Sequence, residues 1–220
     1  IWPHKWDLYS AYALGRGGNG PIKYDGKTIN LYACSSELNG SSGTRIAGIG
    51  TAAHEFTHCL GLPDVYDTSH SGGQGMGSWD LMHSGNYNSS SCIPAPYTAF
   101  ERWLCGWMTP TELKDPCYIE SMEPVVATPL AYIVRNQGHT DEYYMLENHQ
   151  TSYDMGEYHN WDAGLLGSGM LVTHIDYSAT AWSEKKVNTD HSHQRCAYIS
   201  ANGKSTVSAA NLFPYGGRYT

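Results

Sequence analysis

The chain has 220 residues, of which 40% are apolar and 15% charged, so it is long enough for one sizeable domain with its own core. Abundant Gly (24) and Tyr (17) with scarce Phe (3) favour a loop-rich and strand-rich secreted protein over a helical bundle. The formal net charge of −8 excludes a basic surface for nucleic acid or anionic membrane, and no apolar run approaches the roughly 18 residues of a membrane span.

The N-terminal residues Ile1–Trp6 lack the basic start and apolar core of a signal peptide, so we expect either a cytosolic protein or a mature fragment. The cysteines are dispersed without a C-x-x-C pair, which permits disulfides but does not establish them. There are six: Cys34, Cys59, Cys92, Cys105, Cys117 and Cys196.

Few regular elements are predicted in the first fifty residues. A Gly-rich cluster at 15–21 is typical of an exposed loop, and residues 28–34 indicate a short strand. A helix is predicted from about Arg45 to Leu60, because apolar side chains recur there at helical spacing and would form the stripe that faces the core. The stripe consists of Ile46, Ile49, Ala53, Phe56 and Leu60.

The pattern H-E-x-x-H-x-x-G-x-x-D lies within and just after this helix. Residues four apart share a helix face, so His54 and His58 can bind one metal ion, with Glu55 placed to reach a water on that metal. Gly61 can end the helix in the left-handed conformation, after which Asp64 can return as a third ligand. Three protein ligands and one open position are typical of catalytic zinc, for which Glu55 would be the general base.

After this motif the sequence predicts a long loop and then strands. The loop covers residues 64–98 and contains one short apolar stretch, Ser78–Gly85. A second helix is predicted from Pro96 to Trp107. The remaining apolar segments have the composition of strands. They are residues 118–122, 131–135, 142–148, 170–177, 197–200 and 205–209.

Met82 follows His58 by 24 residues, in a turn that resembles the methionine turn of metzincin zinc peptidases. In that clan a methionine forms an apolar floor under the metal-binding histidines. Together, His54–Asp67 and Ser78–Gly85 are similar to the immune inhibitor A family of secreted metallopeptidases. Three further blocks share the resemblance: Leu104–Trp107, Tyr143–Asn148 and Leu166–Asp176.

This resemblance implies a secreted zinc endopeptidase with an α+β, metzincin-like catalytic domain, made as a zymogen with a propeptide and additional domains, and acting on a protein or peptide substrate. Residues 1–61 would form the upper part, ending in the zinc helix, and residues 62–220 the lower part with the methionine turn. Metzincins carry a sheet and a backing helix before the zinc helix, but only 53 residues precede His54. We therefore expect the chain to begin partway through the domain, with an upstream fragment completing the sheet.

The third metal ligand has three candidates. Asp64 has the metzincin spacing, Asp67 lies three residues further on, and Glu101 falls on the next helix, where thermolysin-type enzymes place a glutamate. A different function also fits the motif, namely a binding or structural module with a degenerate metal site, although the retained Glu55 favours an enzyme.

The resemblance leaves the donor that stabilises the transition state open. Many metzincins place a tyrosine two residues after the methionine, where this chain has Ser84. Tyr87, His83 and His174 are the candidate donors. A calcium site is a further possibility, formed by loop carboxylates, although these are more typical of a solvated surface. The carboxylates are Asp141, Glu142, Asp154 and Glu157.

Overall fold

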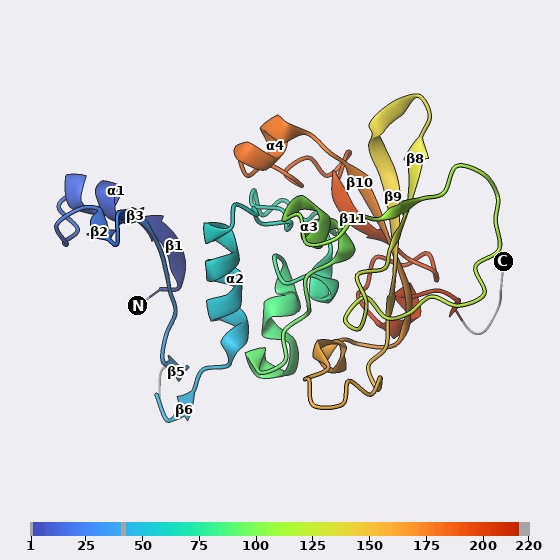
Figure 1. Ribbon diagram of the computed structural model, residues 1–220, viewed down its shortest axis with the longest axis horizontal. Coiled ribbons are helices and arrows are strands. Elements are labelled where there is room, and N and C mark those ends of the chain that lie inside the picture. Colours follow the sequence, from blue (N-terminus) through green and yellow to red (C-terminus); the bar gives the residue numbers. More distant parts are fainter. Residues whose placement is uncertain (1, 41–42, 216–220) are drawn as a thin grey trace.

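The computed structural model describes residues 2–40 and 43–215 and mixes helices with strands, as predicted. Figure 1 shows the N-terminal elements at one end, helix α2 beside them, and a sheet at the other end. The elements that precede α2 are short. They are β1 (His4–Asp7), α1 (Leu8–Ala13), β2 (Ile22–Tyr24), β3 (Lys27–Ile29), β4 (Leu31–Cys34), β5 (Leu38–Asn39) and β6 (Arg45–Ile46).

These short strands pair two by two: β1 with β4, β2 with β3 and β5 with β6, all antiparallel. The prediction of a single strand at residues 28–34 is wrong. The segment forms two strands that are separated by Asn30 and belong to different sheets. No sheet of four or more strands forms among the described residues before α2. The expectation that further strands complete this region stays a prediction.

Helix α2 (Ile49–Cys59) begins four residues later than predicted, because Arg45 and Ile46 belong to β6. Its end agrees with the prediction. Leu60 caps the helix and Gly61 follows with φ of +99°, a value that costs glycine little because it has no β-carbon.

The predicted core stripe of α2 is wrong except at Ala53, which packs against the core. Ile46 is 82% exposed and Phe56 57% exposed, whereas the buried residues of the helix are Gly50, His54 and Thr57. Helical spacing correctly indicates which side chains share a face, but it does not indicate which face meets the protein. In the structure, the small and polar face of α2 packs against the following segment.

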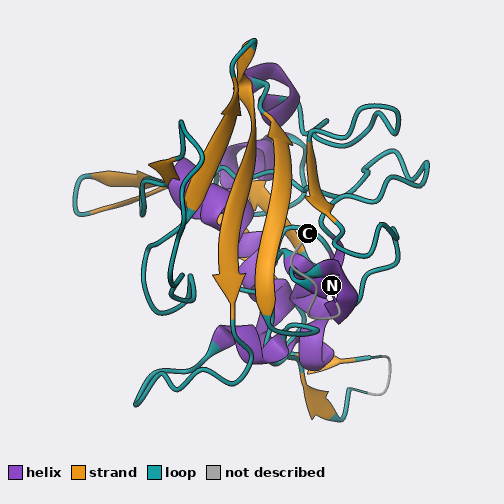
Figure 2. Cartoon of the chain, turned by 90° about the vertical axis from the view of Figure 1, so that its right-hand side faces the viewer, coloured by secondary structure: helices purple, strands orange, loops and turns teal. Residues whose placement is uncertain are grey.

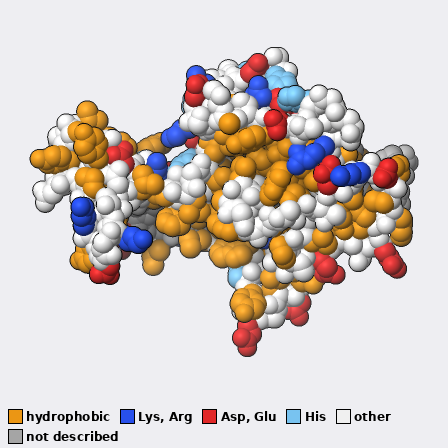
Figure 3. All heavy atoms as spheres, turned by 45° about the horizontal axis from the view of Figure 1, so that its top comes forward, with side chains coloured by type: hydrophobic (Ala, Val, Ile, Leu, Met, Phe, Trp, Pro, Cys, Tyr) orange, Lys and Arg blue, Asp and Glu red, His pale blue; other side chains and the backbone are white. Residues whose placement is uncertain are grey.

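Other apolar side chains are also exposed at the N-terminal end, and Figure 3 shows them gathered over the elements that precede α2. This group comprises Tyr9, Tyr12, Leu14, Ile22, Tyr24, Ile29, Leu31 and Leu38. The N-terminal region therefore buries fewer of its apolar side chains than the rest of the described chain does.

The segment after α2 is largely irregular, as predicted, with two 3-10 turns, η1 (Gly77–Trp79) and η2 (Ser84–Ser91). The second helix, α3 (Ala99–Leu104), is shorter than the predicted range of 96–107. Thr98 sets its start, because the Thr98 hydroxyl accepts the Glu101 N–H while the Glu101 side chain accepts the Thr98 N–H. Pro96 therefore lies before the helix.

The C-terminal part contains a five-stranded sheet with the order β11-β10-β9-β8-β7, antiparallel except between β7 and β8. Four predicted strands are confirmed, as β8 (Tyr132–Asn136), β9 (His139–His149), β10 (Gly169–Asp176) and β11 (Cys196–Ile199). Strands predicted at 118–122 and 205–209 are wrong, because 118–122 and 205–208 are loop and Ala209 begins a 3-10 turn. In this C-terminal part, the elements that we did not predict are β7 (Thr111–Glu112), η3 (Trp161–Gly164), α4 (Ala179–Ser183) and η4 (Ala209–Asn211).

One face of this sheet carries the core and the other is largely open, as Figure 2 shows. Ile133, Met145 and Tyr198 point inward from three strands, and they join Trp79 and Met82 from the irregular segment. None of the six cysteines forms a disulfide among the described residues. In that same part of the chain, every helix is too short or too polar to cross a membrane.

Candidate metal centre

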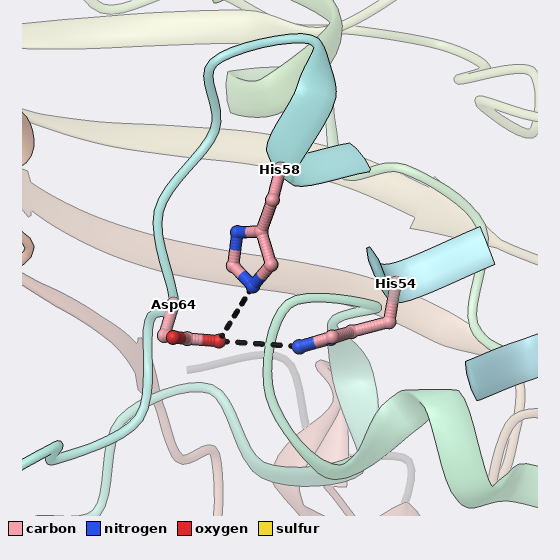
Figure 4. Close-up of side chains that lie close together, drawn as sticks. All are labelled: His54, His58 and Asp64. Carbon is pink, nitrogen blue, oxygen red and sulfur yellow. Dashed lines mark ion pairs between the residues drawn. The ribbon is translucent and has the colours of Figure 1, made fainter. Parts of the chain in front are cut away.

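Two consecutive turns of α2 supply His54 and His58, which therefore lie on the same face of the helix. After Gly61 the chain turns back along the helix and brings Asp64 to the two rings (Figure 4). Asp64 Oδ1 lies 3.2 Å from His54 Nε2 and 3.3 Å from His58 Nε2. The structure thus brings together the three residues that we predicted as ligands.

Both rings are held by backbone carbonyls from different segments. His54 Nδ1 lies 2.8 Å from the Leu81 carbonyl oxygen, and His58 Nδ1 lies 2.8 Å from the Leu62 carbonyl oxygen. Because a carbonyl oxygen only accepts hydrogen bonds, each Nδ1 must carry the hydrogen. The neutral tautomer of each ring therefore presents a lone pair at Nε2, as a metal ligand requires.

Three lone-pair atoms consequently face one another. Asp64 Oδ1 is buried and has no hydrogen-bond donor among the described residues. With neutral rings, this geometry places two imidazole nitrogens and a carboxylate oxygen in mutual repulsion, which a shared cation relieves. The donor set of two imidazoles and one carboxylate also suits zinc.

The local electrostatics favour positive charge between these groups. Burial tends to raise the pKa of Asp64, but the facing imidazoles of His54 and His58 outweigh burial and hold that pKa well below its usual range. Burial likewise lowers the pKa of His54, yet the facing Asp64 leaves it raised overall. Asp64 is therefore a carboxylate at any ordinary pH.

Among the described residues, this trio is the only group of three or more His, Cys, Asp or Glu side chains close enough to hold a metal. The calcium site suggested from the sequence has no support, because its carboxylates form no such group. Of the alternative ligands, Asp67 accepts backbone N–H groups from Ser69, Gly72 and Gly73. Glu101 caps α3 instead.

A cleft of about 630 Å³ opens beside the trio. Glu55 and His54 line it from α2, Trp2 lines it from the N-terminal segment, and Tyr66 and Tyr87 line it from the segment after the helix. Our sequence reasoning did not single out Tyr66. Burial, followed by the nearby charge of Asp64, raises the pKa of Tyr66 to about 12, so its hydroxyl keeps its proton. Its position two residues after Asp64 was the available signal.

Two of the three candidate donors line the cleft, and the third does not. His83 lines the cleft, and its Nδ1 accepts the Gly77 N–H at 2.9 Å, so its proton lies on Nε2. Burial lowers the pKa of His83 to about 4, which keeps the ring neutral. Tyr87 also lines the cleft and is 64% exposed. His174 lies on β10 and bonds Glu142 at 2.9 Å, and it is not among the cleft residues.

Met82 is fully buried, and Leu81–Met82 (the Met82 segment) is fixed at three points. The Met82 N–H donates to Asp80 Oδ1 at 2.6 Å, the Met82 carbonyl accepts the Val65 N–H at 3.1 Å, and the Leu81 carbonyl holds His54. Hydrogen bonds thus join the Met82 segment both to the helix that carries the histidines and to Val65, the residue that follows Asp64.

Comparison with known proteins places this geometry in context. Residues 1–108 match the model of the immune inhibitor A peptidase M6 catalytic domain. The resemblance to the immune inhibitor A family is confirmed. It covers α2, the residues of the trio and the Met82 segment, and it stops before the five-stranded sheet.

Of two similar proteins, one is named as a metalloprotease and the other is named immune inhibitor A. The chain is 32% identical over 105 residues to "Pre-pro-metalloprotease PrtV" of Vibrio cholerae serotype O1, a match that covers 47% of this chain and 11% of that protein. It is 30% identical over 88 residues to "Immune inhibitor A" of Bacillus thuringiensis subsp. alesti, covering 40% of this chain and 12% of that protein. No solved structure matches the chain. The matches span only 11% and 12% of these relatives' lengths. Because the matching family model is that of a catalytic domain, it supports a metallopeptidase catalytic region in this chain.

Proposed function

We propose that the protein is a secreted zinc-dependent endopeptidase, with His54, His58 and Asp64 as the metal ligands. The observation that carries the proposal is the convergence of two Nε2 lone pairs on the buried, donor-free Asp64 Oδ1. The family match over residues 1–108 and the metalloprotease named among the relatives support it.

The chemistry requires a base, which Glu55 supplies. Zinc bound to this trio would acidify a water molecule and polarise the carbonyl of the peptide bond. Glu55 follows the first ligand on α2 and lines the same cleft, where its carboxylate accepts a proton from the attacking water. It then returns that proton to the leaving amine, as general acid–base catalysis requires.

His83 is the donor that the geometry favours for the oxygen that becomes negative in the transition state. It is neutral, it lines the cleft, and the Gly77 N–H fixes its tautomer so that Nε2 carries the hydrogen. Tyr87 lines the same cleft and is the second candidate. His174 serves as a control, because it is engaged by Glu142 on the sheet.

The cleft also supports the proposed division of the domain. Trp2, Thr51 and Glu55 line it from residues 1–61, while Tyr66 and Tyr87 line it from residues 62–220. An extended polypeptide lying between the two parts would pass the trio. A polypeptide substrate therefore fits better than a small molecule, and the word "pre-pro" in the name of one relative supports a propeptide.

The decisive experiment measures zinc content and peptide hydrolysis in the wild-type protein and in Glu55→Gln. We expect one zinc per chain in both, with hydrolysis reduced by about 10²–10⁴-fold in the variant. His83→Phe should reduce kcat, whereas His174→Phe should leave it unchanged. Wild-type protein that binds zinc but hydrolyses no peptide would contradict the proposal and indicate a metal-supported binding module.

A further inference from the structure

Three carboxyl groups lie buried together behind the metal centre. Asp80 is 1% exposed, Glu101 2% and Glu147 1%. They come from three separate parts of the chain, namely the segment before Met82, helix α3 and strand β9. Asp80 and Glu101 lie within hydrogen-bonding reach of each other, and Glu147 is close enough to repel both. We call this group the carboxyl cluster.

Each carboxyl in the cluster has one oxygen engaged by the backbone. The bonds run from the Met82 N–H to Asp80 Oδ1 at 2.6 Å, from the Thr98 N–H to Glu101 Oε2 at 2.7 Å, and from the Ala99 N–H to Glu147 Oε2 at 2.5 Å. Glu101 Oε1 and Glu147 Oε1 are buried and have no donor among the described residues. An ionised carboxylate only accepts hydrogen bonds, so two facing carboxylates cannot satisfy each other.

The cationic neighbours of the cluster are too few to balance it. The ion pairs of Lys and Arg among the described residues go to Glu112, Glu184 and Asp176. The buried His149 is the base beside the cluster, with Nε2 3.7 Å from Glu147 Oε1 and Nδ1 bonded to Asp162 at 2.9 Å. Interaction with Asp162 and Glu147 outweighs burial and raises the pKa of His149 to about 9. One imidazolium thus faces several carboxyls.

We propose that Asp80 and Glu101 share a proton at neutral pH, and that this protonated pair positions the Met82 segment under the metal-binding His54. A shared proton turns one carboxyl into a donor for the other and removes one buried charge. The pair then holds the Met82 N–H through Asp80 and, one residue earlier, the Leu81 carbonyl that accepts His54 Nδ1–H. Asp80 and Glu101 are positioning residues in this account.

Burial raises the pKa of Asp80 to about 7, and it raises that of Glu101 well above its usual range. Neighbouring charges act on the pair from several elements. Glu147 on β9 raises both pKa values, whereas His54 on α2 lowers that of Asp80. The other titratable neighbours that sense the pair are Tyr97, Cys105 and Cys196.

The sign of the pH dependence follows from these directions. A carboxyl whose folded pKa lies above its unfolded value of about 4 binds more proton in the folded state, so the free energy of unfolding falls as pH rises from about 4 to the folded pKa. Above that pH the cluster carries uncompensated charge. The contact between α3 and the Met82 segment then weakens, and with it the placement of His54.

Infrared spectroscopy tests the shared proton directly, without reference to peptidase activity. Wild-type protein at about pH 7 should show the carbonyl stretching band of a buried protonated carboxyl, because ordinary carboxyls are ionised there. The band should disappear at alkaline pH together with a fall in Tm. Glu101→Gln should weaken the band and at least halve the fall in Tm between about pH 5 and about pH 8. Glu120→Gln, which removes an exposed carboxylate, should do neither.

The link to the metal centre rests on the proposed function and has its own measurement. Zinc affinity should fall less between about pH 7 and about pH 9 in Glu101→Gln than in the wild type. Absence of the protonated band from wild-type protein at pH 7 would overturn the shared proton even if the variant does not fold. A variant with wild-type pH dependence of zinc affinity would overturn the positioning role, while peptide hydrolysis in either case tests only the proposed function.

Discussion

Replacing Gly50 by alanine should loosen the packing that fixes α2, the helix that carries His54 and His58. Gly50 lies in the first turns of α2, one turn before His54, and a β-carbon there would stand 1.9 Å from the Asn86 carbonyl oxygen and 3.2 Å from Pro94 Cβ. The first contact is with backbone, which cannot rotate away. Helix α2 and η2 must therefore separate by more than 1 Å to restore ordinary contact.

The expected cost follows from two opposing terms. Overpacking of this kind costs about 1–3 kcal/mol, and contact with backbone argues for the upper end, about 3 kcal/mol. Replacing glycine by alanine inside a helix returns at most about 1 kcal/mol. The net loss is about 2 kcal/mol of unfolding free energy, or about 1 M in the urea midpoint for a typical denaturant slope. Because α2 moves as a unit, zinc affinity should fall as well.

Urea denaturation and zinc competition with a chelator measure the two effects. The matched control is Ala52→Gly, which changes one methyl group on the exposed side of the same helix. It should cost about 1 kcal/mol through helix propensity and leave zinc affinity unchanged. If Gly50→Ala were as stable as the wild type and bound zinc equally well, the close approach of α2 to η2 would not be what holds the helix.

Two further predictions concern the metal centre and its support. Asp64→Asn should weaken zinc binding by more than about 100-fold, which is the upper limit for residues that only support a ligand. Asp67→Asn should weaken binding by less than that. Chelator competition measures both affinities, and the reverse order would assign the ligand role to Asp67. Tyr97→Phe removes the hydroxyl that lies 2.6 Å from Thr57 Oγ1, whose own hydrogen goes to the Ala53 carbonyl. It should cost about 1 kcal/mol in thermal unfolding with unchanged zinc affinity, and a larger loss of affinity would show that this bond also places the histidines.

The approach of His54, His58 and Asp64 to one another could be predicted because it depends on short offsets along the chain. Helical geometry fixes the relation of His54 to His58, and Gly61 permits the turn that returns Asp64. Four of the five strands of the large sheet were predictable for a similar reason, since alternation and β-branched composition are local. The two-residue β7 was not, because it exists only through its parallel pairing with β8.

The orientation of α2 was not predictable from its own residues. Most of its apolar stripe, including Phe56, is exposed, while Gly50 and Thr57 are buried. The reason lies outside the helix: η2 approaches so closely that a β-carbon at Gly50 would meet the Asn86 carbonyl. The carboxyl cluster escaped prediction on the same grounds, since Asp80, Glu101 and Glu147 resemble ordinary surface carboxylates in the sequence and become buried only through tertiary packing.

The geometry of the candidate site therefore depends on parts of the chain that carry none of its proposed ligands. Imidazole orientation is set by the group that accepts each Nδ1–H, and these acceptors are the Leu81 and Leu62 carbonyls. Every residue type has the same backbone carbonyl, so the residue at either position does not reveal that its carbonyl accepts a hydrogen bond from a histidine. What the sequence does hold is the set of residues that fix those carbonyls in space, and Asp80, bonded to the Met82 N–H, is the clearest of them. Substitutions around Asp80 should consequently alter zinc affinity more than substitutions at exposed positions nearer to the metal.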